Sequence, residues 1–298
     1  MLSRSIGSLL TAALLTASAA SAQDEVTFKA TELRDGLYMI QGVGGFAGGN
    51  LGLSIGDDGV VLIDDSMPPF AEKMLEAIAE VTDKPVDFLI NTHVHGDHVG
   101  NNHVMGERGA TIVAHDNIRK RLLEQGIRGQ DGFVEVPEEA LPVVTFSKDI
   151  TFHLNGHEAH VFHVHHAHTD GDGVIHFRDA DVIHTGDAMF NGLFPFIDLD
   201  TGGSLDGYIE AQEKIYALAG DETHIIPGHG PLATKADLGA AVAMLKDAKA
   251  RIAKLKAEGK SEDEVVELNP LADYHDDWNW GFITTERMTR QVYKGLGE

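Results

Sequence analysis

The stretch NTHVHGDHVGN, residues 91–101, constrains this chain more than any other part of its sequence. It follows a compact apolar segment, residues 86–90, which has the length and composition of a buried strand. Neither a packed core nor an ordinary solvated surface favours so many imidazole groups, so the stretch calls for a functional explanation. Within six positions it holds four side chains of the kind that bind metal ions: His93, His95, Asp97 and His98.

The spacing of these four residues predicts two adjacent sites. In an extended chain, residues two apart point to the same side, so the side chains of His93 and His95 converge. Gly96 permits a sharp turn, after which Asp97 and His98 can face a second point nearby.

Zinc usually takes four ligands, so this loop needs help from elsewhere in the chain. Three later segments, HTDG, HTGD and GHG, each lie at an expected strand end or a glycine turn, where small neighbours allow close approach. Imidazole and carboxylate ligands suit zinc, although the lack of sulfur ligands does not exclude iron or manganese. The three segments supply His168, Asp187 and His229 as further candidate ligands.

The four segments together resemble the metallo-β-lactamase fold superfamily, whose HxHxDH, distant His, Asp or Cys, and GH motifs occur in this order. The resemblance covers the chain from its first hairpin to His229 and leaves the C-terminal helices unaccounted for. It implies an α/β fold, the four-layer αβ/βα sandwich, with the site at one edge between the two sheets.

The resemblance also implies a role for each candidate residue. Two zinc ions are expected, with Asp187 bridging them and Asp97 acting in addition as the catalytic general acid and base. One ion would be held by His93, His95 and His168, and the other by Asp97, His98 and His229.

The function expected from this resemblance is that of an exported dinuclear zinc hydrolase, which uses a metal-activated hydroxide to open a carbonyl substrate. A β-lactam is the first choice of substrate, which would make the protein a β-lactamase that contributes to antibiotic resistance. Three residues depart from the best-known lactamase subclass. Asp187 replaces a cysteine, Phe190 replaces a lysine that binds the substrate carboxylate, and Asn101 occupies a position that is often glycine.

Three other functions remain open. The chain could be a lactonase or a thioesterase similar to glyoxalase II. It could also resemble the persulfide dioxygenases, which hold one iron at the equivalents of His93, His168 and Asp187. The last alternative is a protein that carries metal without catalysis.

The N-terminus predicts export. Arg4 gives a positive start, residues 6–15 are apolar, and Ala20-Ser21-Ala22 forms a cleavage site, so we expect a signal peptide at residues 1–22. We expect residues 23–298 to form a single metallo-β-lactamase-like domain in the bacterial periplasm, because no linker or repeat interrupts them. The chain has no cysteine, so its stability has to come from its core without disulfides.

The net charge of −24 argues against nucleic acid and anionic membranes as partners. Two zinc ions would nevertheless leave a positive centre at the site, which suits a small, anionic substrate. Outside the N-terminus, no apolar run is long enough to span a membrane, so we expect no span in the mature chain. The sequence leaves the oligomeric state open.

Short strands and amphipathic helices alternate along the chain, which suggests sheets covered by helices on their outer faces. A helix is expected after Pro68-Pro69, another from Ser204 to about Leu218, and a long one from about Leu238 to Leu255. The expected strands are 37–41, 51–55, 60–64, 86–90, 111–114, 143–146, 160–164, 173–177, 182–185 and 224–226.

Some features keep two interpretations. His166 and His184 either support a ligating carboxylate or are ordinary strand histidines, and the other histidines of segment 153–168 are expected at the surface or around the ligands. The glycine-rich segment 42–50 indicates a hairpin flap with Phe46 at its tip. Trp278 and Trp280 either line a substrate cleft or pack the C-terminal tail.

Overall fold

The protein is described here by a computed structural model that covers residues 25–129 and 132–297. The expected signal peptide, residues 1–22, lies outside the described residues. The larger sheet consists of β1 (Thr27–Arg34), β2 (Leu37–Val43), β3 (Leu51–Gly56), β4 (Gly59–Ile63), β5 (Phe88–Ile90), β6 (Thr111–His115) and β9 (Val144–Phe146), in that order. The smaller sheet consists of β10 (Asp149–Leu154), β11 (His157–His163), β12 (Gly173–Phe177), β13 (Val182–Phe190) and β14 (His224–His229).

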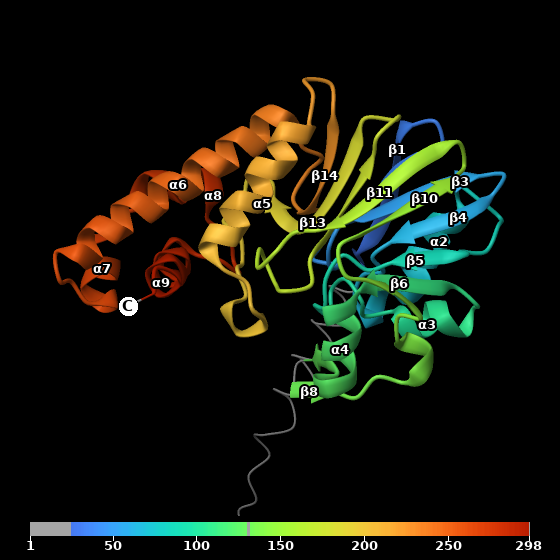
Figure 1. The fold of residues 1–298 in the computed structure, drawn as a ribbon, viewed down its shortest axis with the longest axis horizontal. Coiled ribbons are helices and arrows are strands. Elements are labelled where there is room, and N and C mark those ends of the chain that lie inside the picture. The colour runs from blue at the N-terminus through green and yellow to red at the C-terminus, as the bar shows by residue number, and fades with distance from the viewer. Residues whose placement is uncertain (1–24, 130–131, 298) are drawn as a thin grey trace, which may run out of the picture.

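The helices that the structure describes flank these sheets (Figure 1). A separate strand pair, β7 (Ile127–Gly129) and β8 (Gly132–Val134), follows α4. The helices on the side of the larger sheet are α2 (Ala71–Ala79), α3 (Asn102–Glu107) and α4 (Asp116–Gln125). Those on the side of the smaller sheet are α5 (Leu205–Leu218), α6 (Lys235–Ala257), α7 (Glu262–Leu268), α8 (His275–Trp278) and α9 (Thr285–Gly295).

Neighbouring residues of a strand point to opposite faces of the sheet. The apolar cluster that each residue joins therefore shows what covers each face. In β4, Leu62 belongs to the apolar cluster that contains Met74 of α2, whereas Val61 belongs to a cluster between the two sheets. In β13, Val182 joins the same inter-sheet cluster, whereas Ile183 packs in a third cluster with Tyr208 of α5. The order helix, sheet, sheet, helix follows, and the predicted four-layer αβ/βα sandwich is confirmed.

Strand direction decides where side chains that leave the sheets will meet. β5 runs parallel to its neighbours β4 and β6, and β13 runs parallel to β14. Parallel strands point their carboxyl ends to the same edge, which is where ligands bind in open α/β sheets. The loop 91–101 leaves the carboxyl end of β5 at this edge, and His229 ends β14.

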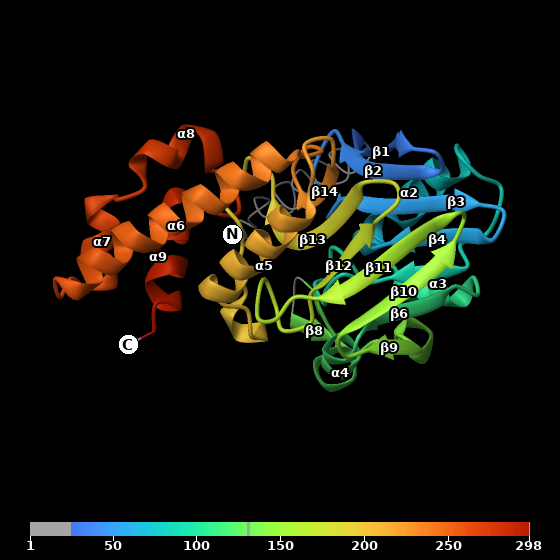
Figure 2. The same cartoon turned by 45° about the horizontal axis from the view of Figure 1, so that its top comes forward.

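The C-terminal helices pack against the smaller sheet through α6 (Figures 1 and 2). Thr234 and Asp237 form a capping box that starts α6, because each side chain accepts a hydrogen bond from the other's backbone. Met288 and Val292 of α9 are fully buried in one apolar cluster with Leu245 of α6. This segment is therefore part of the core although the sequence motifs left it unaccounted for.

All ten predicted strands occur in the structure, and so do the helices predicted after Pro68-Pro69, from Ser204 and from about Leu238, with boundaries shifted by a few residues. The strands β1, β7, β8 and β10 and the helices α3, α4, α7, α8 and α9 were not predicted. β1 lies at the edge of its sheet and is buried mainly at Phe28 and Leu33, so its apolar signal is weak. No helix among residues 25–129 and 132–297 has the length and apolar character needed to cross a membrane.

The buried face of α9 gives a test of this packing. Met288→Ala removes a fully buried side chain and should lower the free energy of unfolding by about 2–5 kcal/mol through lost burial and a residual cavity. Leu268→Ala in α7 is the matched control, since Leu268 is 53% exposed and should lose less than about 0.5 kcal/mol. Urea unfolding measures both, and equal stability of the two variants would show that α9 does not dock as described.

Candidate metal centre

Buried hydrogen bonds fix the first two residues of the loop 91–101 in place. The side-chain amides of Asn91 and Asn102 exchange two hydrogen bonds of 2.9 Å. The backbone N–H of Thr92 donates to Oδ1 of Asp64 at 2.7 Å, and the Thr92 hydroxyl donates to Oδ2 at 2.7 Å. These contacts fix the start of the loop against the end of β4, so the side chains that follow leave the sheet at a defined point.

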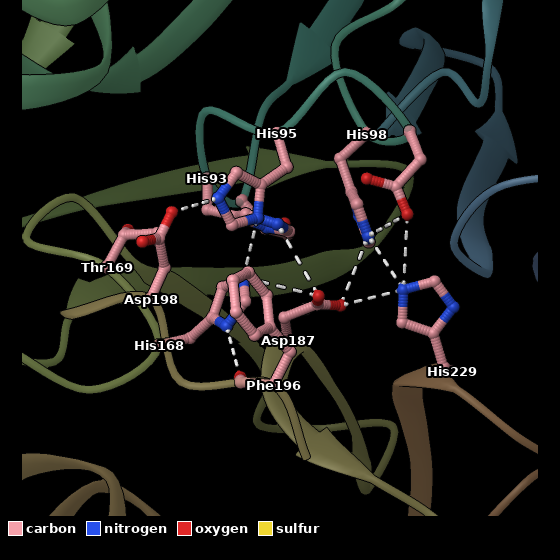
Figure 3. Close-up of polar contacts among 12 residues, drawn as sticks. His93, His95, His98, His168, Thr169, Asp187, Phe196, Asp198 and His229 are labelled. Atoms are coloured by element: carbon pink, nitrogen blue, oxygen red, sulfur yellow. Dashed lines mark hydrogen bonds and ion pairs between the residues drawn. The ribbon is translucent and has the colours of Figure 1, made fainter. Parts of the chain in front are cut away.

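The other three candidate ligands come from the smaller sheet. His168 lies in the connection between β11 and β12, Asp187 lies within β13, and His229 ends β14. Because β13 and β14 are parallel neighbours, Asp187 and His229 reach the same place: Oδ1 of Asp187 lies 3.4 Å from Nε2 of His229. The two sheets thus bring together residues from four separate segments (Figure 3).

A first set of ligand atoms converges around one point. Its members are His93, His95, His168 and Asp187, whose ligand atoms all lie within 4.8 Å of one another. Oδ2 of Asp187 lies 3.3 Å from Nε2 of His168 and 3.6 Å from Nε2 of His93. Three imidazoles and one carboxylate are a donor set that fits zinc.

A second set lies beside the first. Its members, Asp97, His98 and His229, also lie within 4.8 Å of one another. Oδ1 of Asp187 lies 3.1 Å from Nε2 of His98, so one oxygen of this carboxylate faces each set. This is the arrangement that a carboxylate shared by two metal ions requires.

Each of four imidazoles uses its second nitrogen to contact a fixed partner, which sets the direction of the ring. The carboxylate of Asp64 lies 2.7 Å from Nδ1 of His98, and that of Asp198 lies 2.9 Å from Nε2 of His95. Nδ1 of His168 donates to the carbonyl of Phe196 at 2.7 Å, and Nδ1 of His93 contacts the Thr92 hydroxyl at 3.0 Å. The opposite ring nitrogens are thereby left facing the cluster.

Asp64 also forms a close group with His93 and His98. Its two oxygens already accept hydrogen bonds from the backbone and hydroxyl of Thr92, and one of them contacts His98. Asp64 is therefore placed to orient the ring of His98 from behind, while Nε2 of His98 points to Asp187 and Asp97.

Two glycines allow the backbone to approach the cluster. A Cβ at Gly49 would lie 2.1 Å from Cε1 of His98, and a Cβ at Gly228 would lie 2.0 Å from Oδ1 of Asp187. The segment that holds Gly49 is fixed there, because Gly49 N–H donates to the carbonyl of Asp97 and Asn50 N–H donates to that of Gly228. Any larger residue at either position would displace a candidate ligand.

The charges within the cluster shift several pKa values. Burial lowers the pKa of His168 to about 4 and that of His93 well below its usual range. Burial also opposes the charged form of His229, but the carboxylates of Asp187 and Asp97 outweigh it and raise the pKa of His229 to about 9. For Asp187, burial is outweighed by the surrounding histidines, and its pKa falls well below the usual range.

The donor atoms of this cluster fit metal ions. Nε2 of His93 and Oδ1 of Asp187 are buried, and neither atom has a hydrogen-bond partner among the described residues. Such orphaned polar atoms cost free energy in a protein interior unless something binds them. Both point to the centre of the donor sets described above, so a cation there would satisfy them.

The structure brings together all seven residues that the sequence singled out as metal ligands: His93, His95, Asp97, His98, His168, Asp187 and His229. Sequence reasoning missed Asp64, Asp198 and the carbonyl of Phe196. Asp64 directly follows the strand β4, and a carboxylate at that position was a signal that could have been used. Nothing in the sequence near Asp198 pointed to His95.

The histidines that kept two interpretations in the sequence, His166 and His184, contact the backbone. Nε2 of His184 lies 3.2 Å from the carbonyl of Asn50, and His184 Nδ1 accepts from the N–H of Gly186. His166 contacts the carbonyl of Gly202, and the rings of His115 and His163 stack on each other at 3.9 Å. His166 and His184 thus have backbone partners, and within residues 25–129 and 132–297 neither forms a hydrogen bond or ion pair with the carboxylate of Asp97 or Asp187.

Comparison with known proteins shows which family this chain matches. Residues 44–232 match the family model described as the metallo-beta-lactamase superfamily. A hydroxyacylglutathione hydrolase of Pelagibacter ubique (strain HTCC1062) is 27% identical over 105 residues, which are 35% of this chain and only 36% of that protein.

Solved structures with the same fold have lower sequence identity. A metallo-beta-lactamase from Pontibacter korlensis superposes with a TM-score of 0.59 at 18% identity, covering 74% of this chain and 100% of that one. The stereoselective inverting sec-alkylsulfatase from a Pseudomonas species superposes with a TM-score of 0.66 at 16% identity, covering 90% of this chain and 50% of that one. At these identities the likeness concerns the fold.

The two donor sets predict two metal equivalents that can be separated by mutation. The metal-loaded protein should hold about two zinc ions, as two-metal sites do. His229→Ala should weaken binding of the ion in the second set more than binding of the ion in the first, because His229 belongs to the second set only. His153→Ala is the control, since His153 is an exposed strand residue and should retain both ions. Zinc content after dialysis against increasing chelator measures this, and equal loss of both ions from His229→Ala would contradict the assignment.

Proposed function

The chain belongs to the metallo-β-lactamase superfamily, and we propose on that basis that it is a two-zinc hydrolase that opens the carbonyl group of a small anionic substrate. The observation that carries the proposal is the position of Asp187. One of its oxygens faces His93 and His168, and the other faces His98 and His229. A complete second donor set distinguishes this arrangement from one that binds a single ion.

Zinc is the proposed metal because the donors are imidazoles and carboxylates, which suit zinc. The first ion would be held by His93, His95 and His168 and the second by Asp97, His98 and His229, with Asp187 between them. When bound, the ions supply Lewis acidity, which lowers the pKa of water and polarises a carbonyl oxygen.

Asp97 is the residue placed to move a proton. Its Oδ2 lies 3.3 Å from Nε2 of His229 and 3.7 Å from Nε2 of His98, and 23% of its side chain is exposed. Burial opposes the charged form of Asp97, but His98 and His229 outweigh it and hold its pKa well below the usual range. We infer that Asp97 accepts the proton of the attacking water and returns it to the leaving atom as the bond to the carbonyl carbon breaks.

His95 and Asp198 lie on the other solvent-facing side of the cluster, opposite Asp97. The carboxylate of Asp198 holds the Nε2 proton of His95, so that Nδ1 of His95 faces Nε2 of His168 at 2.8 Å. The side chain of His95 is 18% exposed, while His93, His98 and His168 are buried. Water and substrate therefore reach the cluster past His95 and Asp97.

Among carbonyl substrates, a β-lactam is the first that we propose, which would make the protein a β-lactamase. The expected export supports it, since lactams reach a bacterium through the periplasm. A thioester is the second candidate, supported by the partial match to a hydroxyacylglutathione hydrolase. Phe190 is 3% exposed and stacks on His229, so the position of the lysine in the best-known lactamases holds no cation.

A substrate panel tests the hydrolase proposal. The zinc-loaded protein should turn over at least one of a β-lactam, a lactone and a thioester. Asp187→Asn should reduce that turnover by roughly 100-fold or more, the scale for losing one electrostatic group in an active site, because a neutral amide bridges two cations poorly. The fold should survive, since this carboxylate lies at the edge of the sheets.

Asp149→Asn makes the same chemical change at a 60% exposed carboxylate outside the cluster and should keep normal turnover. Zinc content and thermal unfolding are measured on the same preparations. Near-normal turnover by Asp187→Asn with two zinc ions bound would remove the bridging role. Iron in place of zinc, with oxygen consumption on a persulfide, would instead favour the dioxygenase alternative.

The proposed place of action is the bacterial periplasm. If residues 1–22 are a signal peptide, the exported protein should begin at Gln23, because the small residues Ala20 and Ala22 define the cleavage site. N-terminal sequencing of protein from the periplasmic fraction measures this. A substitution of Ala22 by a bulky residue should leave the precursor uncut, and a periplasmic protein that still begins at Met1 would contradict the expectation.

A further inference from the structure

Aromatic rings surround the exposed side of the candidate centre. Two rings stack on His229: Phe190 at 4.9 Å with an interplanar angle of 29°, and Phe46 at 5.7 Å with an angle of 19°. Trp280 lies 6.3 Å from the same imidazole and 6.1 Å from Phe190. Phe46 is 56% exposed, so this side of the centre presents apolar surface to solvent.

The rings continue from His229 to His95. Phe282 lies 5.6 Å from Trp280 and 5.5 Å from Phe196, and Phe196 stacks on His95 at 5.8 Å. Phe282 is 47% exposed. We call Phe46, Phe190, Phe196, Trp280 and Phe282 the aromatic collar.

Hydrogen bonds hold the C-terminal part of the collar in place. The indole N–H of Trp280 donates to the carbonyl of Phe194 at 2.9 Å, and the N–H of Phe194 donates to the carbonyl of Trp278 at 2.8 Å. Gln291 of α9 accepts from the N–H of Ile197 and donates to the carbonyl of Pro195. The segment 278–283 is thus fixed against the segment that carries Phe196, so the partly buried ring of Trp280 and the exposed ring of Phe282 keep a defined position.

A cation lies next to the collar. The Cζ atom of Arg287 is 4.2 Å from the ring centroid of Phe282 and 5.4 Å from that of Phe196. One Nη of Arg287 donates to the carbonyl of Phe282 at 3.0 Å, and no carboxylate within the part of the chain that the structure describes pairs with this guanidinium. Arg287 is exposed, and the ring of Phe196 lies against both Arg287 and His95.

We propose that Trp280, Phe282 and Arg287 form a recognition subsite of the proposed hydrolase, in which the rings bind an apolar group of the substrate and Arg287 binds its carboxylate. The inference rests on the proposed function, because it uses the same centre. Guanidinium groups bind carboxylates in a paired geometry, and stacking on aromatic rings leaves their N–H edges free for this contact.

Charge and exposure favour a ligand over simple packing. In a chain of net charge −24, an unpaired cation beside the opening is a local exception, and it attracts an anion to this point. A buried ring such as Phe190 needs no ligand to explain it, but Phe282 and Phe46 keep about half of their surface in water. The best-known lactamases have a substrate-binding lysine at the position of Phe190. In this chain Arg287 supplies a positive charge near the centre instead. The substrate class that follows is a small carbonyl compound with an apolar ring or branched chain and a carboxylate.

Binding of a stable probe tests the subsite without turnover. The zinc-loaded full mature protein is titrated with 4-phenylbutyrate and with its uncharged amide, and the tryptophan fluorescence is followed. The acid should bind about tenfold more tightly than the amide, the scale of one charge-assisted contact, and Arg287→Gln should abolish this preference. Arg287→Lys should keep part of it. Phe282→Ala should weaken acid and amide alike by roughly fivefold, the scale of one aromatic contact.

Lys294→Gln is the matched control, because it removes one positive charge from the same helix at an exposed residue and should leave the preference intact. A preference that survives Arg287→Gln means that the carboxylate binds the metal ions alone, and this overturns the proposal. So does a loss of affinity in Arg287→Gln that is equal for acid and amide.

Kinetics then separate this inference from the proposed function. With a carboxylate substrate of the panel, Arg287→Gln should raise KM about tenfold and change kcat less than about twofold, whereas the methyl ester of that substrate should show no change. Turnover without this difference overturns the subsite and leaves the hydrolase. Binding of 4-phenylbutyrate that depends on Arg287, in a protein that turns over nothing in the panel, supports the subsite and overturns the hydrolase.

Discussion

The carboxylate of Asp187 lies buried among four histidine rings, and taking such a charge out of water costs several kcal/mol unless opposite charges or hydrogen bonds compensate it. Its position within β13 fixes where the compensation has to come from. His229 arrives from the parallel neighbour β14, and His93 and His98 arrive from the end of β5 in the other sheet. The two sheets can therefore satisfy Asp187 only by meeting at this edge.

The partners behind the cluster hold two of its rings in defined directions. Asp64 and Asp198 hold the rings of His98 and His95 from the outside, and both carboxylates are buried at the ends of regular elements. Side chains held in this way are supported by packing and hydrogen bonds before any ion binds, which reduces the cost of ordering them on binding. The backbone of Gly49 also packs closely against the ring of His98.

The candidate metal centre and the proposed substrate recognition lie on different parts of the chain. The family match covers residues 44–232, which include all seven candidate ligands. Trp280 and Phe282 lie beyond it, on the segment that α9 fixes against the rest of the protein, and Arg287 lies on α9 itself. A C-terminal segment of this kind can change substrate preference while the ligand residues themselves stay the same, because it contacts the centre through rings such as Trp280, which lies against His229.

The sequence by itself determined the fold class and the seven candidate ligands, through motifs whose order resembles that of the metallo-β-lactamase superfamily. Apolar runs mark strands that are buried on both faces, and the spacing of His93, His95, Asp97 and His98 is a local property of one loop. Tertiary structure alone decided the rest. Asp198 is 103 residues from His95, and the aromatic collar joins segments from β2–β3, β13 and the C-terminus. Such contacts depend on how two sheets and their helices pack. The residue pattern within one segment does not predict which distant side chain will contact that segment.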